Sequence, residues 1–123
     1  MSVKQKGSQA ERELLHMFWA KNFATIRSAG SGSMKYPGPD LIASNKARVL
    51  AIECKSTKKS KQYLEEHDVK QLKDFCDIFG AEPWFAVRFA RKDWLFLSIE
   101  DIEKTENGYV IDIKVAQRRG LLI

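Results

Sequence analysis

The segment at residues 48–55, RVLAIECK, leaves fewer folds open than any other part of this sequence. Its apolar half, VLAI, follows a turn and has the composition of a strand buried inside a sheet. Side chains two residues apart in a strand point to the same side, so Glu53 and Lys55 share one face and Cys54 faces the opposite layer. The segment therefore predicts a central strand that carries an acid and a lysine at the end of an apolar run.

The size and composition of the chain predict one compact domain, at residues 1–123. Of the 123 residues, 44% are apolar and 30% are charged, which excludes collagen-like, low-complexity and disordered classes. A chain of this length buries roughly two-thirds of its unfolded surface, so it needs neither disulfides nor a structural metal. Cys54 and Cys76 form no Cys-x-x-Cys motif, and we expect two reduced, largely buried thiols.

No segment predicts a role in a membrane or in export. The apolar runs fall far short of the ~18 residues that span a bilayer. Residues 1–6 are followed by no hydrophobic stretch of the kind found in a secretory leader. We therefore expect a cytoplasmic protein that binds no membrane.

Residues 8–22, SQAERELLHMFWAKN, are predicted to form a helix, with Ser8 as its N-cap and Glu11 completing a capping box. At about 100° per residue, Glu11 falls among the apolar side chains, whereas Arg12 and Glu13 fall on the far side. The expected buried stripe comprises Ala10, Leu14, Leu15, Met17 and Phe18. A carboxylate on this face is anomalous and makes Glu11 a candidate site residue; the alternative is that Glu11 serves the capping box alone.

The rest of the chain alternates short strands with one more helix. We expect a helix at residues 65–79 that ends at Gly80, and strands at 23–27, 40–43, 48–55, 83–89, 94–99 and 109–115. Residues 28–33 read as a loop of small residues and hydroxyls. This order predicts an α/β fold in which helices flank a mixed sheet.

Positive charge is concentrated in the first half of the chain. Residues 1–61 carry 12 Lys and Arg against 4 Asp and Glu, whereas residues 62–123 carry 9 against 12. Between residues 46 and 61, six cations accompany the single acid Glu53, a pattern expected where a protein neutralises phosphates. A solvated lysine loop is the alternative interpretation of this basic run.

Asp40 and Glu53 are predicted to lie side by side. If the chain turns near Lys46, an antiparallel hairpin places them directly opposite each other, with Cβ atoms about 5 Å apart. Two unpartnered carboxylates in an apolar sheet would repel each other and would be costly to desolvate, and Lys55 supplies one charge against two. Mg²⁺, or Mn²⁺ in its place, would satisfy both acids, polarise a scissile phosphate and activate a bound water.

Three neighbouring groups complete this candidate site. Lys55 would orient or help deprotonate the nucleophile, and Glu11 would be a third acid that holds a water on the metal. Cys54 would offer its backbone carbonyl as a metal ligand, rather than its thiol. The alternative is that Asp40 is an ordinary turn residue and that Glu53 and Lys55 form a surface ion pair, but such a pair needs no apolar run before it.

Together these residues resemble the PD-(D/E)xK nuclease superfamily, and more closely the archaeal Holliday junction resolvases of the Hjc type. The resemblance covers most of the first eighty residues and rests on four motifs: Lys6-Gly7-Ser8 with Ala10-Glu11-Arg12-Glu13-Leu14, then Arg27-Ser28-Ala29-Gly30-Ser31-Gly32-Ser33, Pro39-Asp40-Leu41-Ile42-Ala43 and Ile52-Glu53-Cys54-Lys55-Ser56. It implies a restriction-endonuclease-like fold in which Glu11, Asp40 and Glu53 form the acidic site and Lys55 is the catalytic lysine.

The same resemblance implies roles for four further residues. Ser31 would be a loop hydroxyl in the active site, although small loop residues often serve only backbone freedom. Arg27 would contact a phosphate. Phe75 and Phe79 would lie in the interface of a homodimer, with ordinary core packing as the alternative.

These observations lead us to expect a Mg²⁺-dependent endonuclease that nicks two opposed strands of a four-way DNA junction as a dimer. The side chains expected to contact DNA are Lys4, Lys6, Arg12, Arg27, Lys58, Lys59 and Lys61. A nuclease of this superfamily acting on a flap, nick or duplex is one alternative. A non-catalytic module that binds branched DNA is another. The sequence names no partner among recombination proteins.

Overall fold

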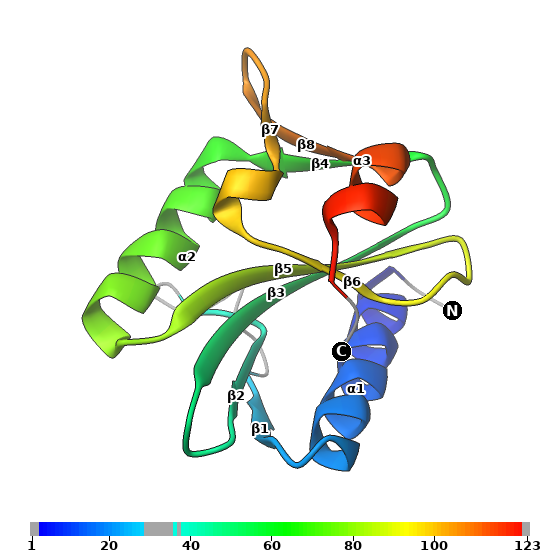
Figure 1. The fold of residues 1–123 in the computed structure, drawn as a ribbon. Helices are drawn as coiled ribbons and strands as arrows, with labels where there is room; N and C mark the ends of the chain where they lie inside the picture. Colours follow the sequence, from blue (N-terminus) through cyan, green and yellow to red (C-terminus); the bar gives the residue numbers. More distant parts are fainter. Residues whose placement is uncertain (1–2, 29–35, 37, 122–123) are drawn as a thin grey trace.

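A mixed β-sheet with a helix on each face forms the centre of the computed structural model, which describes residues 3–28, 36 and 38–121, with side chains from residue 9 onwards (Figure 1). The helices are α1 (Val3–Ala20), α2 (Glu66–Phe79), the 3₁₀ turn η2 (Ile99–Asp101) and α3 (Ile113–Arg119). The strands are β1 (Ala24–Arg27), β2 (Leu41–Ser44), β3 (Val49–Thr57), β4 (Lys61–Glu65), β5 (Glu82–Phe89), β6 (Leu95–Leu97), β7 (Glu103–Lys104) and β8 (Gly108–Asp112).

The five-stranded sheet has the order β1-β2-β3-β5-β6, so β3 is its central strand, as its apolar sequence predicted. β3 pairs in parallel with β5, whereas the other neighbours are antiparallel. A second sheet of three strands, β4-β8-β7, lies beside α2. The expected α/β fold, a mixed sheet flanked by helices, is therefore confirmed.

Each face of the central sheet is covered by one helix. Leu14 and Phe18 of α1 are fully buried in one apolar cluster, together with side chains of β2 and β3 such as Leu41 and Ile52. On the opposite face, α2 packs through Val69, Leu72 and Cys76 in a second cluster that includes Ala51, Phe85 and Val87. The alternation along β3 thus divides its side chains between the α1 face and the α2 face.

The first helix begins earlier than its sequence signals indicated. α1 starts at Val3, so Ser8 lies within the helix and the predicted N-cap and capping box are wrong. Residues 4–6 are Lys, Gln and Lys, which are good helix formers, and the helix continues through Gly7 despite a cost of about 1 kcal/mol. The buried stripe of this helix is confirmed from Ala10 onwards, with Glu11 among it.

The second helix ends where its sequence predicts. Gly80 adopts the left-handed conformation, with φ at 84°, and its N–H donates to the carbonyl of Cys76 at 2.8 Å. Glycine adopts this conformation without the steric strain that a Cβ would cause. This turn leads α2 directly into β5.

The last third of the chain differs most from expectation. The strand expected at residues 109–115 ends at Asp112, whose side chain accepts a hydrogen bond of 2.8 Å from the N–H of Lys114 and caps α3. The strand expected at 94–99 is shorter and is followed by η2. Before this third, β4 was also not expected as a strand, and only its first residue, Lys61, belongs to the basic run.

Candidate active site

The β2–β3 hairpin aligns Asp40 with Glu53 in the register that the sequence predicted. Leu41 pairs with Ile52, so the next positions along the two chains are Asp40 and Glu53. The N–H of Cys54 donates to Oδ2 of Asp40 at 2.8 Å. Because β2 begins only at Leu41, this bond replaces the next rung of the ladder and holds the Asp40 carboxylate against β3.

Glu53 and Lys55 follow Ala51 on the α2 face of β3, whereas Cys54 packs with the cluster on the α1 face. All three side chains are half-buried. The predicted division of these residues between two layers is therefore confirmed. Burial and nearby carboxylates raise the pKa of the Cys54 thiol well above its ordinary value of 9.0, so this thiol stays protonated.

Glu53 lies in an environment that disfavours its negative charge. Burial, followed by the charges of Asp40, Asp68 and Glu11, raises the pKa of Glu53 to about 8, and Lys55 opposes this rise only in part. A carboxylate with a pKa near neutrality, beside a second acid and a lysine, is typical of a functional site. For Asp40 and Glu53 to be ionised together, the site needs more positive charge than the single ammonium of Lys55 supplies.

Glu11 and Arg27 form an ion pair beside this hairpin. Nε of Arg27 donates to Oε1 of Glu11 at 2.9 Å, and both side chains are about four-fifths buried. Burial and the charge of Asp40 raise the pKa of Glu11, and Arg27 counteracts them. The arrangement brings Glu11 within electrostatic reach of Asp40 and Glu53, and it holds Arg27 against an acid.

Asp68, in the first turn of α2, is a site neighbour that the sequence analysis missed. Its charge contributes to the raised pKa of Glu53, and its side chain also lies 3.2 Å from Nδ1 of His67. Among the described side chains, one cluster of carboxylate and imidazole groups is compact enough to hold a metal ion. It comprises Glu65, His67 and Asp68. Asp68 lies four residues before Leu72, so it shares the face of α2 that packs on the sheet. The same helical spacing that predicted the apolar stripe of α2 could therefore have placed Asp68 near the site.

The basic run between residues 46 and 61 does not form one surface. Its first members, Lys46 and Arg48, lie at the beginning of β3, and Arg48 forms two hydrogen bonds with Glu82, at 2.7 and 2.9 Å. Strand β3 then extends for nine residues, roughly 30 Å, before the exposed Lys58. The run is therefore divided between two ends of the sheet.

The side chains expected to contact DNA have different surroundings. Arg12, Lys58, Lys59 and Lys61 are exposed, and Lys61 is the first residue of β4. Arg27 is largely buried against Glu11. The side chains of Lys4 and Lys6, and the whole of Ser31, lie outside the described residues.

On α2, Phe75 is partly buried and stacks on Phe79, with ring centroids 5.0 Å apart. Phe79 is 54% exposed and its neighbour Ile78 is 90% exposed. Phe75 thus contributes to the core, while Phe79 presents an aromatic surface next to it.

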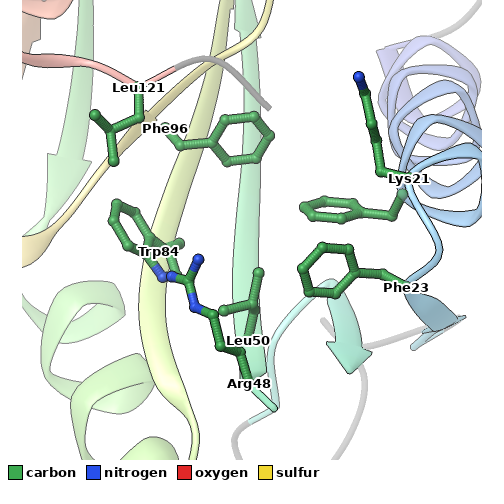
Figure 2. A pocket seen from close by; sticks show the side chains of 8 residues that line it. Lys21, Phe23, Arg48, Leu50, Trp84, Phe96 and Leu121 are labelled. Carbon is green, nitrogen blue, oxygen red and sulfur yellow. The ribbon is translucent and has the colours of Figure 1, made fainter. Parts of the chain in front are cut away.

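An apolar hollow of about 330 Å³ lies between the end of α1 and the beginning of β3 (Figure 2). It is lined by Phe18, Lys21, Phe23, Arg48, Leu50, Trp84, Phe96 and Leu121. Leu50 belongs to the α1 face of β3, whereas Glu53 lies on the α2 face. This hollow is therefore separate from the carboxylates of the candidate site.

Comparison with known proteins matches this arrangement to one family. The family model described as archaeal Holliday junction resolvase (Hjc) matches residues 2–121. The chain belongs to this family. Among the resolvases, it is 42% identical over 113 residues to the crossover junction endodeoxyribonuclease Hjc of Archaeoglobus fulgidus, covering 92% of this chain and 83% of that one. It is 40% identical over 111 residues to Hjc of Methanocaldococcus jannaschii, covering 90% and 79%.

The solved structure of the Archaeoglobus fulgidus resolvase superposes on this chain with a TM-score of 0.88 at 40% identity, covering 96% of this chain and 92% of that one. The resolvase fold expected from the motifs is thereby confirmed. Both cysteines are free, with Cys76 buried and Cys54 partly so. None of the described helices combines the length and apolar character that crossing a bilayer requires.

Proposed function

We propose that this resolvase is a divalent-metal-dependent endonuclease that cuts four-way DNA junctions at the site of Asp40, Glu53 and Lys55. The main support is the 2.8 Å bond from the Cys54 N–H to Asp40, which holds one carboxylate beside the strand segment that carries the other. The relatives named above are crossover junction endodeoxyribonucleases. Their likeness over nine-tenths of this chain supports a junction as its substrate.

The donor groups at this site fit Mg²⁺, or Mn²⁺ in its place. Carboxylates of Asp40 and Glu53 are hard oxygen ligands of the kind these ions prefer. The N–H and C=O of one strand residue point to the same side, so the Cys54 carbonyl is directed toward Asp40, as its N–H is. The raised pKa of Glu53 indicates a shortage of positive charge that a divalent ion would supply. When bound, the ion would polarise the scissile phosphate and activate a water at neutral pH.

The protein's own groups orient the reacting atoms. Lys55 shares a face with Glu53, and its ammonium would donate to a phosphate oxygen and stabilise the charge that develops there in the transition state. Glu11, with a pKa raised by burial, would accept a hydrogen bond from the attacking water. Arg27 is a positioning residue in this proposal, since its Nε fixes the Glu11 carboxylate.

We further propose that two copies of the chain associate through α2. Ile78 and Phe79 leave a large apolar surface exposed at the end of this helix, beside the partly buried Phe75. A two-fold dimer would present two cleavage sites, related by symmetry, to two opposed strands of a junction. Phe79→Asp should give a monomer in sedimentation analysis, whereas Tyr63→Asp, at a similarly exposed position on β4, should remain dimeric.

The proposed activity is tested with a labelled four-way junction, a flap and a plain duplex, each incubated with Mg²⁺ or with EDTA. We expect paired nicks in the junction with Mg²⁺ only. Asp40→Asn, Glu53→Gln and Lys55→Ala should abolish cutting and keep junction binding, while the exposed Glu100→Gln serves as the matched control. Equal cutting of flap or duplex would indicate a nuclease with another target, and binding without cutting would indicate a non-catalytic module.

A further inference from the structure

The turn between β5 and β6 has a backbone conformation that its residues disfavour. Ala90 and Arg91 have φ angles of 32° and 66°, and the N–H of Lys92 donates to the carbonyl of Phe89 at 2.7 Å. These are the features of a type I′ turn, in which Asn and Gly are preferred because other side chains resist positive φ. Strained backbone of this kind persists where the surroundings hold it and is concentrated at functional sites.

This turn is fixed to the end of the central strand. The N–H of Ala90 donates to the carbonyl of Thr57 at 2.8 Å, so the tip of the turn lies beside the last residue of β3. Thr57 is two residues after Lys55. The strained turn therefore presents Arg91 at the same end of the sheet as the candidate active site.

A surface hollow of about 410 Å³ opens beside this turn and is lined by Ser56, Lys58, Arg88, Ala90 and Arg91, which we call the basic hollow. Ser56 and Arg88 are paired across the parallel strands β3 and β5. Arg88 also forms an ion pair with Glu13 of α1, which orients its guanidinium. Three cations and one hydroxyl thus line the hollow, and one acid compensates a single one of these charges.

The basic hollow lies on the α1 face of the sheet, opposite Glu53 and Lys55. Ala86 of β5 packs in the α1 cluster, and Arg88, two residues later, points the same way. Ser56 directly follows Lys55 along β3. The basic hollow and Lys55 therefore lie near the same end of β3, on opposite faces of the sheet.

We propose that the basic hollow binds a backbone phosphate of a junction arm beyond the cleavage site, with Arg91 as its principal contact. Guanidinium groups form paired, charge-assisted hydrogen bonds with phosphate oxygens, and the Ser56 hydroxyl and Lys58 ammonium add further donors. Such a contact positions DNA without reading its sequence. This inference rests on the proposed junction substrate and adds to it a second anchoring point outside the carboxylate site.

The test separates the stability of the turn from the binding of DNA. In the double variant Ala90→Asn with Arg91→Gly, the turn receives its preferred residues and loses its cation. We expect a higher melting temperature than wild type together with junction binding weakened about tenfold in EDTA. The slope of log Kd against log salt concentration should fall by about 0.9 for each phosphate that the variant no longer neutralises. Arg91→Gln, which keeps the side-chain bulk, should weaken binding similarly.

Two controls accompany these variants. Ala90→Asn alone keeps Arg91 and measures how much of the change in melting temperature comes from this substitution. Arg118→Gln removes one exposed charge from α3, away from the hollow, with little effect on the salt slope. Wild-type affinity and salt slope in both Arg91 variants, or losses no larger than that of Arg118→Gln, would overturn the proposal. Failure of wild type to prefer a four-way junction over duplex would instead refute the proposed substrate, and the Arg91 variants would then be compared on duplex.

Discussion

Replacing Glu53 with glutamine should stabilise the metal-free protein at neutral pH, by an amount that grows as the pH rises. Burial, Asp40 and further neighbouring acids raise the pKa of Glu53 from its ordinary value of 4.5 to about 8 in the folded protein. Between these two values the folded protein holds a proton that the unfolded chain has released. Protonated Glu53 therefore makes its full contribution to the free energy of unfolding of wild type below pH 4.5, and wild type loses this contribution as the pH rises toward 8.

The size of this effect follows from the proton linkage. Each pH unit in that window removes about 1.4 kcal/mol from the free energy of unfolding of wild type, so about 3 kcal/mol is lost between about pH 5.5 and pH 7.5. Glutamine resembles the protonated acid and does not titrate, so the variant escapes this loss. For a domain of this size, the resulting difference in melting temperature is about 10 °C at the upper pH.

The assay is thermal or urea unfolding of both proteins in EDTA across this pH range. The quantity compared is the difference in free energy of unfolding between Glu53→Gln and wild type. Glu82→Gln is the matched control, because pairing with Arg48 lowers the pKa of Glu82 and its contribution should be constant above about pH 5.5. Added Mg²⁺ should reduce the Glu53→Gln difference, since an ion bound at the carboxylates stabilises wild type. A difference that stays flat with pH for Glu53→Gln would refute the reasoning.

Three further outcomes are expected. Arg27→Met should raise the pKa of Glu11 further, and the pH profile of cleavage should shift to higher pH. Urea unfolding should show that the free energy of unfolding falls by about 1–3 kcal/mol, because a largely buried carboxylate loses its partner. Asp40→Asn retains an oxygen for the Cys54 N–H and should unfold within a few degrees of wild type, while Asp40→Ala should lose about 1–3 kcal/mol more. Gly108→Ala should lower the melting temperature strongly in a thermal scan, since a Cβ there would lie 2.4 Å from a backbone oxygen of the neighbouring strand; an unchanged melting temperature would contradict the packing of β4 on β8.

Local sequence decided those parts of the protein in which contacting residues are close along the chain. The turn between β2 and β3 is short, so its position determines which residues pair, and this is why the proximity of Asp40 and Glu53 could be predicted. The period of α2 and its terminal glycine, Gly80, are likewise local properties. The four motifs shared with the resolvases all lie within the first eighty residues, and they allowed the family to be predicted from the sequence.

Contacts between distant segments depended on the tertiary structure. β4 exists as a strand because its five residues pair with β8, from Lys61 with Asp112 to Glu65 with Gly108, and no local pattern in β4 indicates so distant a partner. The ion pair between Glu11 and Arg27 likewise depends on how α1 packs on the sheet.

The charge states of the site residues also depended on the tertiary structure. The sequence predicted that two acids and a lysine would lie together at the end of a buried strand. Only packing determined that α2 brings Asp68 close enough to Glu53 to affect its pKa. The physical reason is that a side chain's charge state depends on burial and on neighbours through space, which chain order alone does not specify.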